Sequence, residues 1–141
     1  MYLIADASVI IKWFIRLRES DRKQALAIKK QMLDGKFILA APDLLFYEVI
    51  NVLTIKQGVK KTSLDRMIKL LFQYPFEIIW PSGELFESAV KLAKRFDLTI
   101  YDAIYLALAQ ELDSPLVTAD NKLYQKSLKI ETKLLRNFKI E

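Results

Sequence analysis

The alternation of short apolar runs with longer helical segments is the feature of this sequence that most restricts its fold. Each run is short, apolar and bounded by turn or cap residues, as buried strands are. The predicted strands are Tyr2–Ala5, Phe37–Ala41, Phe76–Trp80 and Leu116–Thr118. Strand–helix alternation indicates βαβ units, and hence an α/β protein with a parallel sheet covered by helices on both faces. The 141 residues contain no linker or repeat, so we expect a single domain over residues 1–141.

Helices are predicted wherever apolar residues follow the helical period between these strands. The segments are Ser8–Arg16, Glu19–Leu33, Asp43–Gln57, Thr62–Gln73, Pro81–Arg95, Thr99–Gln110 and Lys122–Ser127. Thr62 and Asp65 have the spacing of a capping box, which gives Asp65 a structural role. The final segment, Leu128–Glu141, has no clear period. Both a fifth edge strand near Lys129–Thr132 and a terminal helix are compatible with it.

Composition excludes several kinds of chemistry. The chain has no Cys and no His, which rules out disulfides, thiolate nucleophiles, Cys/His zinc sites, His-ligated haem, Ser-His triads and ribonucleases that use a His pair. Lys and Arg number 22 against 17 Asp and Glu, a formal charge of +5. This balance suits a polyanionic partner such as nucleic acid, although a lysine-rich solubilising surface explains the charge equally well.

Hydropathy patterning argues against membrane insertion and export. No apolar run reaches the roughly 18–20 residues that a bilayer span needs. The first residues, MYLIADAS, lack a basic lead-in and carry an acid at Asp6, unlike a secretion signal. We therefore expect a cytoplasmic protein with no membrane partner.

The two most apolar helices each contain one acid in an unfavourable setting. Asp102 lies in TIYDAIYLALAQ, and Glu48 lies in LLFYEVINVLTI, where Asn51 is its polar neighbour on the same face. A buried carboxylate without a partner must take up a proton or find a cation. The structural alternatives are a capping box of Thr99 with Asp102, and a solvated surface position for Glu48.

Two further acids follow predicted strands. Asp6 comes directly after the first strand, and Asp120 lies two residues beyond the fourth. Either residue could simply be the N-cap of the next helix. In open parallel sheets, however, ligands gather outside the carboxyl ends of the strands, where both acids are expected.

A shared divalent cation explains all four acids together. Four neighbouring carboxylates repel one another strongly unless a cation lies between them, and Mg²⁺, or Mn²⁺ in its place, prefers such oxygen ligands. In a basic protein, an acid-only site of this kind suggests metal-dependent phosphodiester hydrolysis. Other phosphate chemistries fit less well. No glycine-rich phosphate loop is present, and the D-x-D of haloacid-dehalogenase phosphatases is interrupted by Ser8.

These motifs together resemble those of the PIN-domain nucleases, and most closely the VapC-like toxins of type II toxin–antitoxin systems. The resemblance rests on Asp6 with Ser8, Glu48 with Asn51, YDAIYLALA around Asp102, and the TAD of residues 118–120. It extends from position 2 to about position 124. The YDA-x-YLALA and TAD segments are specific in combination, whereas D-x-S alone would be weak.

The resemblance implies a three-layer α/β/α sandwich with a central, mainly parallel sheet of four or five strands. It implies an endoribonuclease dependent on Mg²⁺ or Mn²⁺, which acts on RNA as a toxin. It also implies a homodimer inhibited by an antitoxin whose C-terminal segment lies across the active site. The corresponding catalytic and metal-binding residues are Asp6, Glu48, Asp102 and Asp120, with Ser8, Asn51, Thr118 and Asn121 in support.

Two rival interpretations remain open at this point. One is a housekeeping nuclease that processes RNA and has no antitoxin. The other is a non-catalytic RNA-binding module that kept the fold, although the presence of all four acids argues against it.

Overall fold

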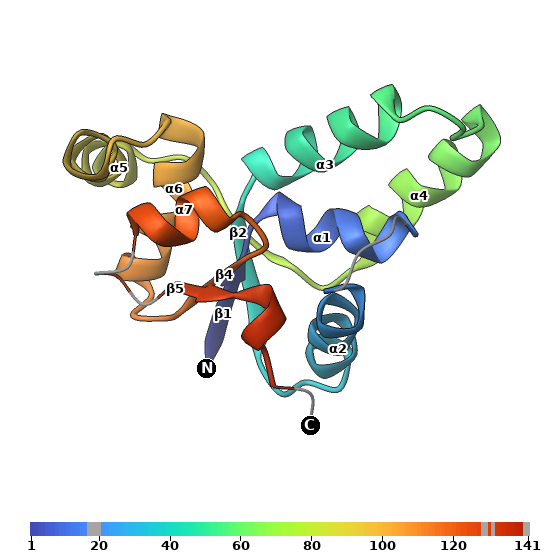
Figure 1. The fold of residues 1–141 in the computed structure, drawn as a ribbon, viewed down its shortest axis with the longest axis horizontal. Coiled ribbons are helices and arrows are strands. Elements are labelled where there is room, and N and C mark those ends of the chain that lie inside the picture. Colours follow the sequence, from blue (N-terminus) through green and yellow to red (C-terminus); the bar gives the residue numbers. More distant parts are fainter. Residues whose placement is uncertain (17–20, 128–129, 131, 140–141) are drawn as a thin grey trace.

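A single parallel sheet forms the centre of the molecule (Figure 1). The computed structural model describes residues 1–16, 21–127, 130 and 132–139. The strands are β1 (Tyr2–Ala5), β2 (Ile38–Pro42), β3 (Glu77–Ile79), β4 (Leu116–Thr118) and β5 (Thr132–Leu134). Their order is β3-β2-β1-β4-β5, and all four neighbouring pairs are parallel. The expected α/β class is confirmed, with five strands.

Seven α-helices and one 3₁₀ turn connect and follow these strands in the described part of the chain. They are α1 (Ala7–Phe14), α2 (Arg22–Leu33), α3 (Leu44–Ile55), α4 (Lys61–Gln73), α5 (Gly83–Phe96), α6 (Ile100–Glu111), α7 (Asn121–Lys126) and η1 (Leu135–Asn137). None of the helices within the described ranges is long and apolar enough to cross a bilayer.

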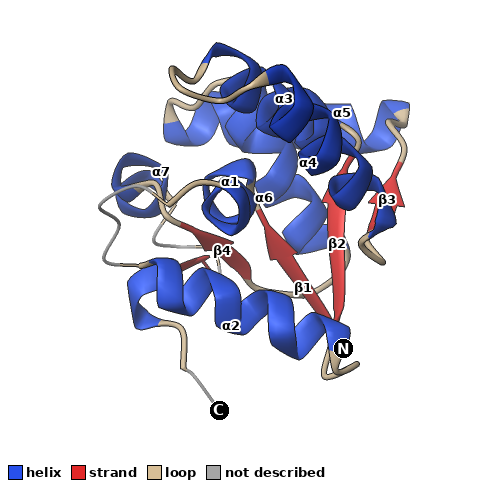
Figure 2. Ribbon diagram, turned by 90° about the vertical axis from the view of Figure 1, so that its right-hand side faces the viewer, coloured by secondary structure: helices blue, strands red, loops and turns tan. Residues whose placement is uncertain are grey.

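The sheet separates two hydrophobic clusters. Leu3 and Ala5 of β1 face one cluster and Ile4 faces the other, because neighbouring side chains of a strand point to opposite faces. The first cluster contains residues of α1–α4, and the second contains residues of α5–α7. The two groups of helices lie on opposite sides of the sheet in Figure 1, and Figure 2 shows α1 and α2 lying across one face. The expected three-layer sandwich is confirmed.

Two local predictions are corrected or sharpened by the structure. The capping box at Thr62 is wrong, because α4 begins at Lys61 and its N-cap is Lys60, with no side-chain cap. Thr62 is already inside the helix. The edge-strand alternative for the C-terminal segment holds at residues 132–134, where β5 pairs with β4. Residues 19–20, 129 and 131 of the predicted elements lie outside the described residues.

The two most apolar helices differ in how far they are buried. Residues 103–109 of α6 are all buried. Helix α3 is fully buried along Leu45, Val49 and Leu53, at four-residue spacing, and Phe46, Ile50 and Val52 are partly buried against the same cluster. Its remaining face exposes apolar side chains to solvent, with Tyr47 71% exposed.

Candidate active site

Strands β1 and β4 bring Asp6 and Asp120 to the same edge of the sheet. The two strands are hydrogen-bonded neighbours, with Ile4 opposite Leu116 and Ala5 opposite Val117. Strand β2 lies on one side of β1 and β4 lies on the other, so the strand order reverses at β1. Such a reversal in strand order opens a crevice at the carboxyl ends of the strands, where ligands of open α/β sheets bind.

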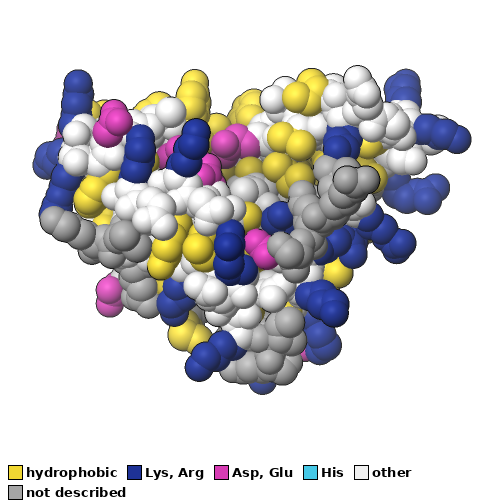
Figure 3. Space-filling model, in the orientation of Figure 1, with side chains coloured by type: hydrophobic (Ala, Val, Ile, Leu, Met, Phe, Trp, Pro, Cys, Tyr) yellow, Lys and Arg dark blue, Asp and Glu magenta, His cyan; other side chains and the backbone are white. Residues whose placement is uncertain are grey.

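Helices α3 and α6 add Glu48 and Asp102 at this edge. Helix α3 leaves the carboxyl end of β2 and carries Glu48 in its second turn. Helix α6 leads into the start of β4, so it runs from the carboxyl edge of the sheet back towards the amino edge. Its first turn, which contains Asp102, therefore lies at the carboxyl edge too. Figure 3 shows acidic side chains grouped in the hollow at the upper centre of this face, with Lys and Arg side chains beside them and around the outline.

Asp6 is the most deeply placed of the four acids, at 7% exposure. The Ser8 backbone N–H donates to Oδ1 over 3.0 Å, the Ser8 hydroxyl donates to the same oxygen, and the Thr118 hydroxyl donates to Oδ2. Burial raises the pKa of Asp6 to about 6, the hydrogen bonds from Ser8 and Thr118 oppose that rise, and the charge of Asp102 adds to it. Desolvation thus outweighs three hydrogen bonds.

Ser8 and Thr118 also connect β1 to the start of α7. The Ser8 hydroxyl accepts from the Ala119 N–H over 2.9 Å, and the Thr118 hydroxyl accepts from the Asp120 N–H over 3.0 Å. Asp120 then caps α7, its Oδ1 accepting from the N–H groups of the second and third following residues over 2.7 and 3.1 Å. Capping and participation in the site are therefore compatible for Asp6 and Asp120.

Replacing Thr118 by Val should lower the free energy of unfolding by about 1–3 kcal/mol. Thr118 is fully buried, and its loss leaves Asp6 Oδ2 and the Asp120 N–H without these partners. Urea unfolding of the variant measures the change. Thr54→Val is the matched control, because among the described residues the exposed Thr54 hydroxyl donates to the Ile50 carbonyl of its own helix over 2.7 Å, away from the acids. Equal small losses in both variants would contradict a supporting role for Thr118.

Glu48 is half-buried and is held by a residue that the sequence analysis did not select. The Tyr105 hydroxyl donates to Glu48 Oε1 over 2.8 Å. Burial raises the pKa of Glu48, the Tyr105 hydrogen bond opposes this, and the charges of Asp6 and Asp102 reinforce it. The available signal was a tyrosine three residues after Asp102 on a buried helix, since a buried Tyr hydroxyl needs a polar partner.

Asp102 lies in the first turn of α6 with Thr99 as the N-cap. The Thr99 hydroxyl accepts from the Asp102 backbone N–H over 3.2 Å, so the cap uses the main chain of Asp102. Burial raises the pKa of Asp102, and the charge of Asp120 raises it further. The Thr99 hydroxyl and the Lys126 ammonium act in the opposite direction. The acids are thus close enough to raise one another's pKa values, while other residues of the protein also donate hydrogen bonds to them.

Two of the predicted supporting residues, Asn51 and Asn121, form no side-chain hydrogen bond with the four acids in the described part of the chain. Asn51 is exposed on α3 and lines an outer apolar groove with Phe72 and Trp80. The Asn121 side chain accepts a hydrogen bond from Arg136 over 3.2 Å. Their participation in the site stays a prediction.

The acids match a divalent cation in chemical type. Every site side chain offers carboxylate or hydroxyl oxygen, which hard cations such as Mg²⁺ and Mn²⁺ prefer. Among the described residues, no three acids lie close enough to hold an ion as their side chains stand. The mutual pKa effects persist because Coulomb interactions reach farther than a coordination bond. A shared ion therefore requires at least one of the acid side chains to move from its present position.

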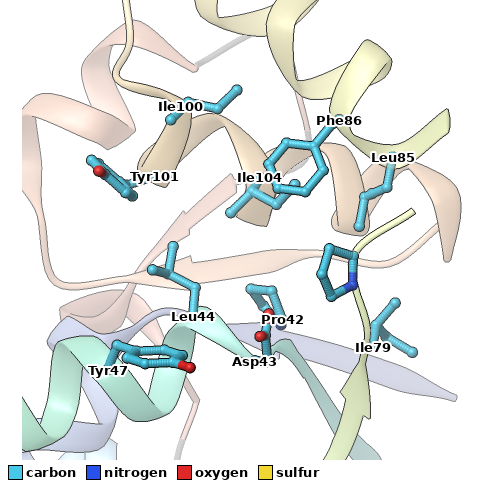
Figure 4. Close-up of a pocket in the computed structure, with 11 residues that line it drawn as sticks. Pro42, Asp43, Leu44, Tyr47, Ile79, Leu85, Phe86, Ile100, Tyr101 and Ile104 are labelled. Carbon is cyan, nitrogen blue, oxygen red and sulfur yellow. The ribbon is translucent and has the colours of Figure 1, made fainter. Parts of the chain in front are cut away.

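An apolar cavity of about 210 Å³ lies beside the acids, between α3 and α6 (Figure 4). Tyr47 and Tyr101 border it, and each directly precedes a site acid in the chain. Of the residues described, none of the four site acids lines this cavity. The cavity therefore lies next to the four acids and does not contain them.

Comparison with known proteins agrees with this architecture. The family model described as the PIN domain matches residues 3–129. Ribonuclease VapC3 of Pyrobaculum aerophilum is 28% identical over 130 residues, covering 89% of this chain and 95% of that protein. Ribonuclease VapC1 of Mycobacterium tuberculosis is 36% identical over 123 residues, covering 81% of this chain and 87% of that protein.

A solved toxin–antitoxin complex from Klebsiella pneumoniae contains a chain of the same fold. It aligns with a TM-score of 0.60 at 24% identity, and covers 86% of this chain and 89% of that one. With the family-model match and the curated relatives, the sequence motifs and the fold lead to one assignment. The chain belongs to the PIN-domain family and, within it, to the VapC-like group.

Proposed function

We propose that this protein is an Mg²⁺- or Mn²⁺-dependent endoribonuclease that acts as the toxin of a toxin–antitoxin pair. The observation that carries the proposal is the arrangement of Asp6, Glu48, Asp102 and Asp120 at one edge of the sheet. The pKa values of the first three are raised by burial and by the charges of fellow members of the set. A divalent cation offsets both effects at once.

In this proposal the four carboxylates hold the ion. When bound, the ion orients the scissile phosphate, neutralises developing charge and lowers the pKa of an attacking water. Asp6 is anchored from both sides by Ser8 and Thr118, so it provides the most rigid ligand. Lys126, whose charge acts on Asp102, brings a cation to the rim of the site, where an RNA phosphate would approach.

RNA as substrate and an antitoxin as partner are supported by different observations. The net charge of +5 suits a polyanion, and the curated relatives are named ribonucleases. The Klebsiella structure is a toxin–antitoxin complex of this fold, which supports an antitoxin here. Exposed apolar side chains on α3 and α5, such as Tyr47 and Val90, support the homodimer, because subunit interfaces cover such surfaces.

A housekeeping RNA-processing nuclease is the main alternative, and a non-catalytic RNA-binding protein is the other. The gene immediately upstream separates the first from a toxin, since a small DNA-binding protein encoded there favours a toxin–antitoxin pair. RNA cleavage by purified protein separates the second.

The direct test is cleavage of a panel of labelled single-stranded and structured RNAs in Mg²⁺, in Mn²⁺ and in EDTA. We expect cleavage with either metal, none in EDTA, and a loss of at least about 100-fold in Glu48→Gln, since metal chemistry supplies several kcal/mol of transition-state stabilisation. Asp65→Asn, at an exposed acid on α4, is the matched control and should retain full activity. Cleavage that persists in EDTA would sink the metal-dependent mechanism.

A further inference from the structure

We propose that Tyr105 is a positioning residue for Glu48, whose carboxylate it holds by Oε1 so that Oε2 stays available to a cation. The inference rests on the proposed function, because it concerns how one of the proposed metal ligands is oriented. It adds a residue that acts through Glu48 without touching the ion.

The hydrogen bond joins two separately packed helices. Tyr105 belongs to α6 and Glu48 to α3, and the Tyr105 hydroxyl lies 2.8 Å from Glu48 Oε1. Tyr105 is 1% exposed and packs in the cluster formed by α5–α7 with the sheet. Its ring is fixed by that packing, so its hydroxyl is a fixed point against which the Glu48 carboxylate is set.

Glu48 needs such a support more than the other acids do. Asp6 and Asp120 have short side chains and accept backbone N–H groups in their own caps. Glu48 lies within α3, next to the exposed Tyr47, and has a longer side chain with more rotatable bonds. Ordering a long side chain costs conformational entropy, and the Tyr105 hydrogen bond offsets part of that cost before an ion binds.

A tyrosine suits this position because it donates a hydrogen bond without adding charge. Its phenol is neutral near pH 7. A lysine or arginine at position 105 would also hold Glu48, but would cancel the negative charge that attracts the cation. The hydroxyl also lies three residues after Asp102, one helical turn along α6, so one helix both supplies an acid and orients another.

The test is the Mn²⁺ dependence of thermal stability in Tyr105→Phe, a change that keeps the buried ring. We expect Mn²⁺ to raise the Tm of the wild type, and the Mn²⁺ concentration needed for a fixed rise in Tm to increase about 10-fold in the variant, as on removal of other hydrogen bonds to metal ligands. A purely structural hydroxyl would change the Tm in EDTA and leave that concentration unchanged. In a Glu48→Gln background, Tyr105→Phe should cause no further shift.

Tyr74→Phe is the matched control, since Tyr74 is a partly buried tyrosine that packs against the rings of Trp13, Phe14 and Phe76. It should need the same Mn²⁺ concentration as the wild type for a given rise in Tm. An unchanged concentration in Tyr105→Phe, or an undiminished change in the Glu48→Gln background, would overturn the role of Tyr105 alone. A wild type whose Tm does not respond to Mn²⁺ would overturn the metal site itself, and this role with it.

Discussion

Asp102→Asn is expected to abolish RNA cleavage, by at least about 100-fold, without destabilising the protein in EDTA. The loss follows from removing one of four proposed metal ligands, because metal chemistry supplies several kcal/mol of transition-state stabilisation. Stability should be kept because the Thr99 cap uses the Asp102 backbone N–H, which asparagine retains. The variant also removes a carboxylate whose ionisation is disfavoured by burial and by Asp120.

The magnitudes separate this account from a capping role. Asparagine removes the cost of a buried charge close to Asp120. It also loses the attraction between the carboxylate and the positive end of α6, which is worth a few tenths of a kcal/mol. We therefore expect the free energy of unfolding to stay level or rise slightly. If the side chain were needed for the cap, the same variant would lose about 0.5–1 kcal/mol. Urea unfolding in EDTA and a cleavage assay on one preparation decide between them. A destabilised variant that still cleaves RNA is incompatible with our assignment.

Asp6→Asn is expected to stabilise the protein in EDTA at pH 7.5, by about 1–3 kcal/mol. The pKa of Asp6 is raised from 3.8 to about 6, and each unit corresponds to about 1.4 kcal/mol between the two protonation states. Asparagine has no charge to desolvate, and its Oδ1 still accepts from the Ser8 N–H in the α1 cap. Its Nδ2 group must donate to the Thr118 hydroxyl, where the carboxylate accepted from it, and this offsets part of the gain. The same variant should lose RNA cleavage.

The pH dependence of this gain has a definite sign. Between pH 3.8 and about 6 the folded protein holds the Asp6 proton while the unfolded chain releases it. The wild type therefore loses stability relative to Asp6→Asn as the pH rises through this window, and the difference levels off above it. Urea unfolding at pH 4, 5, 6 and 7.5 follows the change. If the free energy of unfolding changed with pH in the same way in both proteins, burial would not hold the proton on Asp6.

The strand–helix alternation was sufficient to predict the α/β sandwich. The limits of β1 and β4 match those predicted, because each strand is short, largely buried and followed within two residues by an acid that caps a helix. The prediction was less accurate where burial depended on neighbours. The sequence of α3 is apolar on every side, yet only its Leu45 stripe is fully buried and Tyr47 and Ile55 are exposed, because burial depends on where α1 and α4 pack.

The four candidate acids could be selected from the sequence, together with Ser8 and Thr118 as their supports, whereas Tyr105 could not. Asp6, Glu48, Asp102 and Asp120 stood out because each conflicts with an apolar or strand-end setting. The Tyr105–Glu48 hydrogen bond joins residues 57 positions apart, and its tyrosine resembles an ordinary core residue in the sequence. Local spacing carries no information on such a long-range contact. Thr118 was selected as a supporting residue from the TAD segment, but its hydrogen bond to Asp6 depends on the pairing of β1 with β4.

The most direct test of a shared cation is the Mn²⁺-induced change in Tm of the wild type and of Asp6→Asn, Glu48→Gln, Asp102→Asn and Asp120→Asn, with Asp65→Asn as control. The measurement needs no RNA and reports binding to the folded protein alone. We predict a clear rise in Tm for the wild type and the control, and a strongly reduced rise in each of the four variants. An unresponsive wild type, or an unchanged rise in all four variants, would contradict a common metal site.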